Sequence, residues 1–260
     1  MSDWPGSRPA PKGRLPRDDR PETGDRRPGF KYSRSPVPGP RSLLKGFLVT
    51  QPKLVIVDYG VGNFRNVQKA FEAVGAAAEI TDSVQTVEAA EVVVLPGVGA
   101  FGDAMRHLRE RGLDQPVLAA ARAGKPVFGI CVGLQLLFEE SEEMGRHEGL
   151  GILPGKIVRF PNRPGFVVPH MGWNQIEPAR PHPLLRRVNS GDFAYFAHSY
   201  YAVPANPADI IACTDYGQLF PTVVGRDNVC AIQFHPEKSQ QVGLQILRNF
   251  VEWAGGGEEG

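Results

Sequence analysis

From Lys53 onward the chain repeats one pattern, in which a short apolar run is followed by a glycine-containing turn and then by an amphipathic stretch. Residues 54–57 are continuously apolar, which is typical of a parallel strand buried on both faces. In residues 67–74 the apolar side chains recur every three or four positions, which predicts a helix, and Gly75 is a typical residue to end it. This alternation predicts an α/β fold with an open, mainly parallel sheet and flanking helices.

The same pattern continues to residue 130 and then changes. The further strands predicted in the first half are 77–80, 92–95 and 126–130, and the further helices are 103–111 and 113–123. The second half has short β-rich runs separated by Gly, Pro, Asn and Asp, which predict strands at 157–160, 173–176, 192–197, 200–203, 210–214 and 229–234. They indicate a mixed or antiparallel extension of the same sheet, which an amphipathic helix over 242–253 closes.

Residues 1–50 differ in composition from the rest of the chain. They hold 11 Lys and Arg against 5 Asp and Glu, together with 9 of the 24 prolines, and their apolar residues follow no period. Such a segment buries too little surface to offset the entropy of ordering. We therefore expect a disordered, basic, Pro/Arg-rich extension at 1–50 and one folded domain at 51–255. The extension is interpreted as a solvated tail, or as a segment upstream of a true start near Val49, rather than as a tether for nucleic acid.

Overall composition excludes several classes of protein. The 260 residues are 42% hydrophobic and 22% charged, which is ordinary for a soluble globular chain. No run of eighteen apolar residues predicts a membrane span, and no apolar segment near the N-terminus predicts a secretory signal. Three cysteines are too few for a disulfide scaffold and suit a reducing compartment. These features predict a cytoplasmic protein with no membrane partner.

The run GICVG at residues 129–133 lies between a predicted strand and an apolar stretch that predicts a helix. In a nucleophile elbow the reactive side chain sits on a sharp turn above the strand end, and small residues on either side let the chain bend. The N–H groups at the start of the helix favour an anion. Cys131 is therefore predicted to be a nucleophile that attacks a carbonyl as the thiolate. The alternative is a small buried core residue.

A base and an acid follow a later apolar run. His235 and Glu237 come directly after residues 229–234, and side chains two apart in extended chain point to the same face. The Glu237 carboxylate can then accept one imidazole proton and fix the tautomer of His235. Thiol, imidazole and carboxylate form the triad that recurs on unrelated folds, so Cys131, His235 and Glu237 are predicted to be catalytic.

Acyl transfer at a thiolate also requires hydrogen-bond donors for the oxyanion. The backbone N–H of Val132, directly after the nucleophile, is one predicted donor. The turn at Gly97, Val98 and Gly99 is predicted to supply another, because it follows a parallel strand and so lies at the same rim of the sheet.

Residues 97–102 also match the GxGxxG pattern of dinucleotide-binding proteins. In those proteins the next strand ends in an acidic residue that holds the ribose, whereas here it ends in Cys131. A dinucleotide is therefore not expected. No other cofactor and no metal are predicted, because neither a Walker A sequence nor metal-ligand spacing occurs.

Together these motifs resemble the class I, triad-type glutamine amidotransferases. The shared motifs are PGVG at 96–99, GICVGLQ at 129–135 and HPE at 235–237. Within that family the chain is similar to the glutaminase subunits of imidazole glycerol phosphate synthase, through residues 58–63, 149–155, 169–174, 198–201 and 238–239. The matching motifs span 53–252 and imply a flavodoxin-like fold. Two departures are Val132, where the family often has Leu, and the N-terminal extension.

The resemblance implies a role for each matching residue. Cys131 attacks the side-chain amide of glutamine, His235 protonates the departing ammonia, and water hydrolyses the γ-glutamyl thioester. Glu237 orients His235. Substrate contacts are implied for Gln135, Ser199, Tyr200 and Gly97.

The resemblance also implies a partner. Ammonia would pass to a separate (β/α)8 cyclase subunit in a heterodimer that serves histidine biosynthesis. Asn63, Trp173 and Lys238 match positions that face the cyclase; their alternatives are a helix cap, a core aromatic and a surface charge. Met171 and Gly172 are expected to serve only a turn.

Three other functions are compatible with the elbow and the triad. A class I glutaminase of another pathway would share both, although residues 169–174 and Lys238 argue against it. A stand-alone thiol hydrolase or peptidase would be active without a partner. A catalytically silent binding scaffold would need a broken triad, and none of the three residues is missing.

Overall fold

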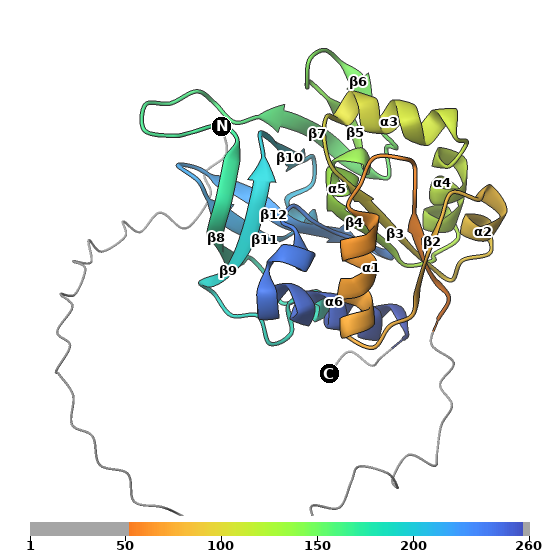
Figure 1. Ribbon diagram of the computed structural model, residues 1–260. Helices are drawn as coiled ribbons and strands as arrows, with labels where there is room; N and C mark the ends of the chain where they lie inside the picture. The colour runs from red at the N-terminus through yellow and green to blue at the C-terminus, as the bar shows by residue number, and fades with distance from the viewer. Residues whose placement is uncertain (1–51, 257–260) are drawn as a thin grey trace, which may run out of the picture. The chain divides into compact units, whose positions relative to one another are not determined.

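The computed structural model describes residues 52–256, so the extension predicted for residues 1–50 lies outside the described part of the chain. This part is built around a nine-stranded sheet in the order β2-β1-β3-β4-β13-β12-β11-β8-β9 (Figure 1). The first five strands are parallel: β2 (Ala78–Thr81), β1 (Leu54–Val57), β3 (Val92–Gly97), β4 (Val127–Cys131) and β13 (Val229–Ile232). Their order is that of flavodoxin-like folds, as predicted.

The other four strands extend this sheet in antiparallel fashion. They are β12 (Leu219–Arg226), β11 (Ile210–Asp215), β8 (His170–Pro178) and β9 (Asp192–His198). The α/β class with a parallel core and an antiparallel extension is thus confirmed. The strand β12 was missed, because Pro221 interrupts its apolar run and proline is usually confined to edge strands. Here Pro221 lies inside the sheet, opposite Cys213 of β11.

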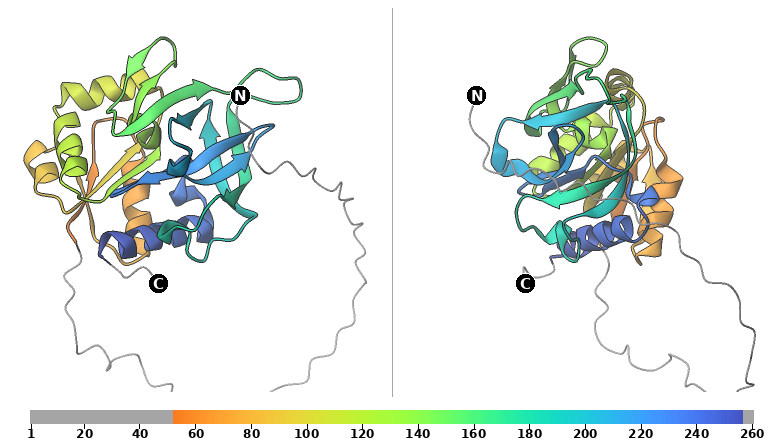
Figure 2. Two further views of the ribbon diagram at one scale, coloured as in Figure 1. Left: turned by 180° about the vertical axis from the view of Figure 1, so that it is seen from behind. Right: turned by 90° about the vertical axis from the view of Figure 1, so that its left-hand side faces the viewer.

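Helices cover both faces of the parallel half. On one face α1 (Phe64–Ala73) packs beside α6 (Gln240–Ala254), and Phe128 of β4 stacks on Phe250 of α6 with ring centroids 4.3 Å apart (Figures 1 and 2). The opposite face carries α2 (Val84–Glu88), α3 (Phe101–Glu110), α4 (Asp114–Arg122) and α5 (Val132–Leu136). Every residue of β1, β3, β4 and β13 is buried between these layers, which explains their continuously apolar sequences.

A second, four-stranded sheet corrects one expectation. Its order is β10-β7-β5-β6, with β10 (Tyr200–Pro204), β7 (Leu153–Arg159), β5 (Phe138–Ser141) and β6 (His147–Glu148). Residues 157–160 and 200–203 therefore do not extend the main sheet, as the sequence suggested. The helix after the elbow is short: α5 ends at Leu136, and β5 begins two residues later.

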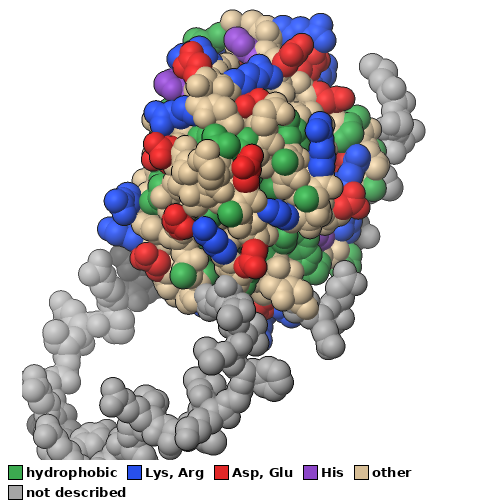
Figure 3. Space-filling view, turned by 90° about the vertical axis from the view of Figure 1, so that its right-hand side faces the viewer, with side chains coloured by type: hydrophobic (Ala, Val, Ile, Leu, Met, Phe, Trp, Pro, Cys, Tyr) green, Lys and Arg blue, Asp and Glu red, His purple; other side chains and the backbone are tan. Residues whose placement is uncertain are grey.

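The surface over α2 and α4 carries charges of both signs. Figure 3 shows Lys and Arg side chains interspersed with Asp and Glu on this face. These helices are amphipathic. Their polar faces point to solvent, and their apolar faces bury Val87, Val117 and Ala120. Within residues 52–256, no helix has both the length and the apolar character that a membrane span requires.

Candidate active site

The carboxyl ends of four parallel strands meet at one edge of the main sheet. The turns after β1, β3, β4 and β13 carry Asn63, Val98–Gly99, Cys131 and His235. A cavity of about 320 Å³ opens there. Its walls are formed by Val98, Gly99, Cys131, Val132, Gln135, Glu143, Pro169, Met171, Ala197, His198, Ser199, Tyr200, His235 and Lys238. Ligands of open α/β sheets bind at this edge, so the fold and the motifs indicate the same place.

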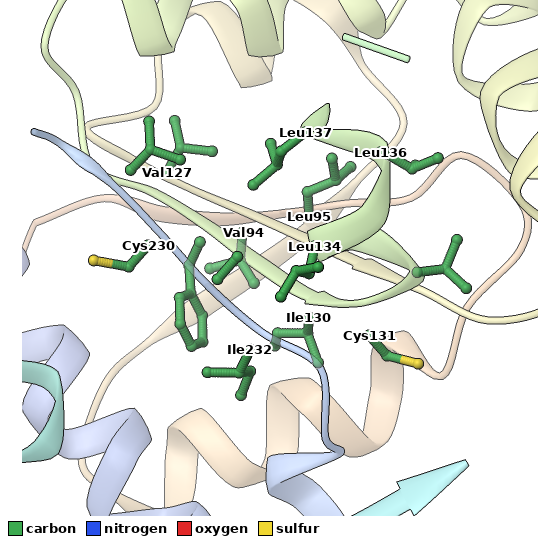
Figure 4. Packing of buried hydrophobic residues seen from close by; sticks show 14 of the residues in the cluster. Val94, Leu95, Val127, Ile130, Cys131, Leu134, Leu136, Leu137, Cys230 and Ile232 are labelled. Carbon is green, nitrogen blue, oxygen red and sulfur yellow. The ribbon is translucent and has the colours of Figure 1, made fainter. Parts of the chain in front are cut away.

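Cys131 occupies the sharp turn predicted for a nucleophile elbow. It is the last residue of β4 and the N-cap of α5, with φ 56° and ψ −112°. Two glycines allow the bend. A Cβ on Gly133 would overlap the carbonyl oxygen of Leu95, and one on Gly129 would lie 2.9 Å from the backbone of Leu134. Figure 4 shows Cys131 beside Ile130, at the edge of the apolar cluster beneath the elbow.

His235 and Glu237 are in direct contact. The Nδ1 atom of His235 lies 3.1 Å from Oε1 of Glu237, and both side chains are buried. The local backbone differs from the extended chain assumed from the sequence, because residues Pro236–Lys238 form a short 3₁₀ helix. The contact forms nevertheless. The loop is anchored by the His235 N–H, which donates to the Tyr195 carbonyl, and by the Ser239 hydroxyl, which donates to the His235 carbonyl.

Electrostatics favour a charged imidazole in this site. Burial alone lowers the pKa of His235, but its interactions with Cys131, and then its hydrogen bond to Glu237 and the negative charge there, raise that pKa above its ordinary value. For Glu237, burial raises the pKa, while the hydrogen bond from His235 and its positive charge lower it, and the net direction is downward. His235 and Glu237 therefore favour imidazolium and carboxylate at neutral pH.

The predicted oxyanion donors lie around the sulfur. Val132 is in the first turn of α5, where N–H groups have no acceptor within the helix. Val98 and Gly99 line the cavity from the β3 turn, and Gly99 has the positive φ of +85° that favours glycine. Gly97 lies deeper. It is buried opposite Cys131 in the β3–β4 ladder, against the hydroxyl of Tyr59.

Three of the four residues predicted to contact substrate, Gln135, Ser199 and Tyr200, line the same cavity, and Gly97 does not. Ser199 and Tyr200 line it from the junction of β9 and β10. The side-chain nitrogen of Gln135 donates to the Tyr200 carbonyl at 3.0 Å and to Oε1 of Gln233 at 3.1 Å. Its donors are thereby engaged, and the Oε1 atom of Gln135 is left to accept a hydrogen bond from a ligand.

Sequence reasoning missed Glu143. Its side chain lines the cavity, and Oε2 accepts a hydrogen bond of 2.7 Å from the N–H of Phe101, the first residue of α3. In the sequence Glu143 stands in the acidic run EESEE at 139–143, where nothing distinguishes it from its neighbours. Only the turn that folds this run back toward α3 places one of these carboxylates in the cavity wall.

Of the three residues predicted to face a partner, Lys238 lines the cavity. Trp173 is 46% exposed on β8, and its ring contacts Tyr195 of β9 edge to face at 6.0 Å. The Nζ atom of Lys238 lies 5.5 Å from the centroid of the Tyr195 ring. Asn63 turns inward, and its side-chain nitrogen lies 3.4 Å from Oε1 of Glu237. It is the N-cap residue of α1, but its side chain makes no capping hydrogen bond.

Residues 171 and 172 lie in a strand. Met171 and Gly172 do not serve a turn, because both are paired with β9 inside the strand β8, and Met171 is 65% exposed. Within residues 52–256, no group of three or more His, Cys, Asp or Glu side chains is arranged to hold a metal ion.

Comparison with known proteins gives consistent results. The model of the family "Glutamine amidotransferase class-I" matches residues 55–253. Imidazole glycerol phosphate synthase subunit HisH of Syntrophotalea carbinolica is 55% identical over 202 residues, covering 76% of this chain and 98% of the relative. The subunit of the same name from Geobacter sulfurreducens is 49% identical over 205 residues, covering 77% and 98%.

Solved structures share the fold at lower identity. A crystal structure of a glutamine amidotransferase has a TM-score of 0.62 and 24% identity, covering 78% of this chain and 99% of that one. The structure of PurLQS from Thermotoga maritima has a TM-score of 0.61 and 19% identity, covering 78% and 99%. The family match over residues 55–253 and the close identity to the HisH subunits are together decisive: this chain belongs to the class I glutamine amidotransferases, as a glutaminase subunit of the HisH type.

Proposed function

We propose that Cys131 carries the glutaminase reaction of this chain, with His235 and Glu237 as its acid–base pair. The observation that supports this most directly is that Cys131, at a strained elbow, lines the same cavity as His235, which is backed by a buried contact of its Nδ1 with Glu237. A thiol and an imidazole in one cavity can supply the nucleophile and the proton that the leaving group needs.

In the first half of the reaction the thiolate attacks the side-chain carbonyl carbon of glutamine. The C=O electrons move onto oxygen, and the N–H groups of Val132 and of the Val98–Gly99 turn stabilise that oxyanion. When the C–N bond breaks, His235 gives its proton to the nitrogen, so ammonia leaves and a γ-glutamyl thioester remains on Cys131. Glu237 stays ionised throughout and fixes the orientation of the ring.

In the second half, neutral His235 acts as the base. It takes a proton from a water molecule that attacks the thioester, the C–S bond breaks, and glutamate leaves. Cys131 returns to the thiolate and His235 to the imidazolium, so the site is restored.

Side chains and backbone groups of the cavity wall would bind the glutamine substrate. The Glu143 carboxylate matches an α-ammonium group, and Oε1 of Gln135 can accept a further N–H from the substrate. The backbone of Ser199 and Tyr200 offers polar groups on the opposite side. Peptides would need room beyond this about 320 Å³ cavity, which favours a free amino acid over a peptidase substrate.

We further propose that the ammonia is delivered to a (β/α)8 cyclase subunit that docks over the cavity mouth, in a cytoplasmic enzyme of histidine biosynthesis. The identity to HisH subunits supports this assignment. So does the surface of the β8–β9 hairpin, where Met171, Trp173 and Phe193 are 65%, 46% and 50% exposed. Exposed apolar side chains gathered in one place mark protein interaction sites.

The test is a glutaminase assay of the purified chain, alone and with a candidate cyclase subunit and its ribonucleotide ligand. We expect slow hydrolysis by the chain alone and a rise of at least about tenfold in the complex, which is ~1.4 kcal/mol of barrier. Full activity without the cyclase would contradict the partner-dependent assignment and favour a stand-alone thiol hydrolase.

A further inference from the structure

Two buried histidines outside the triad face each other across the β8–β9 hairpin. His170 and His198 are paired in the strand register and are 3% and 6% exposed. The Nδ1 atom of His170 lies 3.3 Å from Nε2 of His198. His198 also lines the active-site cavity, although the mechanism assigns it no part.

The hydrogen bonds around this pair determine which nitrogen of each ring carries the proton. Nδ1 of His198 lies 2.8 Å from the carbonyl oxygen of Tyr200, and a carbonyl only accepts, so Nδ1 of His198 is the donor. In a neutral ring its Nε2 must then accept, which makes Nδ1 of His170 a donor as well. Nε2 of His170 in turn accepts from the side-chain nitrogen of Asn174, 3.3 Å away.

The surroundings keep both rings neutral. Burial lowers the pKa of His170 to about 4. The pKa of His198 is lowered to about 3, mainly by burial, with smaller contributions from His170 and His235 against the hydrogen bond to the Tyr200 carbonyl. The two rings are packed among aromatic side chains: Phe160, Phe196, Tyr216 and Phe220.

The Tyr200 carbonyl joins this pair to the reacting sulfur. It accepts from Nδ1 of His198 and also from the side chain of Gln135. Gln135 donates in addition to Gln233, whose side-chain nitrogen lies 3.8 Å from the sulfur of Cys131. A continuous series of hydrogen bonds therefore leads from Asn174, next to exposed Trp173, to the nucleophile.

We propose that His170 and His198 are positioning residues: two neutral imidazoles, both protonated on Nδ1, that hold the Tyr200 carbonyl and with it the wall of the glutamine site. This proposal rests on the proposed function and adds residues to the same site. Without the His198 donor, the Tyr200 carbonyl keeps Gln135 as its partner but loses its restraint from the β8–β9 hairpin. The Ser199–Tyr200 segment is then less well placed for binding, whereas the triad is untouched.

The kinetic test compares two substitutions at one position, in the full chain combined with the cyclase subunit. His198→Leu removes the donor at similar size, and we expect the KM for glutamine to rise about tenfold or more while kcat changes little. His198→Asn keeps an N–H at the same number of bonds from the backbone, and we expect it to restore the KM most of the way. Equal KM values for wild type and His198→Leu would overturn the proposal, as would equal damage in both variants.

His182→Leu is the matched control. His182 is also partly buried, with a pKa lowered to about 4 chiefly by burial and also by Arg180, but it accepts from Leu184 N–H beside the η1 helix (Pro183–Leu185) and does not line the cavity. We expect this variant to leave the KM for glutamine unchanged. A rise equal to that of His198→Leu would mean that loss of a buried histidine, rather than the link to Tyr200, causes the effect.

A second readout needs no activity. Nitrogen NMR of the full chain labelled with ¹⁵N-histidine distinguishes the two neutral tautomers and the imidazolium. We expect two rings that stay neutral and Nδ1-protonated between pH 6 and 8, and we expect His198 to stay Nδ1-protonated in His170→Leu, because the Tyr200 carbonyl still accepts from it. An Nε2-protonated or charged His198 in the wild type would overturn the assignment. Absence of any glutamine turnover by the wild-type complex would instead count against the proposed function, while leaving this NMR result standing.

Discussion

Cys131 has a φ of 56° and a ψ of −112°, a conformation that costs a non-glycine residue about 1–3 kcal/mol and persists only where its surroundings impose it. The strain places the sulfur above the end of β4, at the start of α5. Individual residues of the triad could be predicted from sequence because each stands in a short local motif that already contains its structural requirement. The glycines at 129 and 133 are such a requirement.

Other residues of the cavity could not be predicted, because their roles depend on contacts between distant parts of the chain. Glu143 belongs to a run of acidic residues and reaches the cavity only through a turn against α3. His170 and His198 are 28 positions apart and meet only through the register of β8 and β9. Gln233 precedes a recognised motif, but its contact with Gln135 spans 98 positions.

Substituting Glu237 by Gln tests the electrostatics of the triad. The carboxylate helps to hold the pKa of His235 above its ordinary value, so Glu237→Gln should lower that pKa and reduce kcat by about 10²–10⁴-fold through loss of ring orientation. The measurement is the pH dependence of the glutaminase rate in the complex.

The same substitution should change stability in a defined pH range. A raised folded-state pKa means that His235 stabilises the fold fully below its unfolded value of about 6.5, and that this contribution is lost as pH rises through the folded value. The lowered pKa of Glu237 gives stability present above its unfolded value of about 4.3 and lost as pH falls through the folded value. In Glu237→Gln the Glu237 contribution should be missing and the His235 contribution reduced, whereas Glu110→Gln, in an exposed pair with Arg106, should leave the profile unchanged. Identical profiles for wild type and Glu237→Gln would contradict the ion pair.

At the level of elements, the periodicity of the sequence predicted most of the parallel half. The strand at residues 54–57 agrees at both ends with β1, and the helices predicted at 103–111 and 113–123 are α3 and α4 with ends shifted by one or two residues. Periodicity cannot show which strands pair with one another. Residues 157–160 and 200–203 read as strands, yet which sheet they join is decided by distant partners, and they form a separate sheet with β5 and β6.

Substitutions are least tolerated at the junction of β4 and α5. A Cβ at residue 133 would overlap the backbone of Leu95 on β3, which cannot move without disturbing the central sheet. We expect Gly133→Ala to lower the free energy of unfolding by about 1–3 kcal/mol or more, as overpacking of a core does. Denaturant unfolding measures this.

Gly255→Ala is the control for that prediction, because a Cβ there meets nothing closer than 3.4 Å. It should leave the unfolding midpoint close to that of the wild type. A Gly133→Ala protein as stable as the control, with its glutaminase activity intact, would show that the elbow does not need glycine at this position.

For the molecule as a whole, the parallel half supplies the nucleophile and its base, and the antiparallel half supplies the opposite wall and the exposed hairpin. The cavity lies between these halves, with Cys131 on one side and Ser199 and Tyr200 on the other. Family membership was predictable because the motifs span both halves in a fixed order. The order alone did not reveal that the Asn63 side chain contacts Glu237.

The central claim is that the Cys131 sulfur releases ammonia from glutamine for use by the cyclase subunit. Its most direct test is the Cys131→Ala variant, assembled with the cyclase and assayed for synthesis from glutamine and, separately, from ammonium salt. We predict that synthesis from glutamine falls by at least about 10³-fold, as expected on loss of a nucleophile, while synthesis from ammonium continues. Continued use of glutamine by this variant would contradict the account.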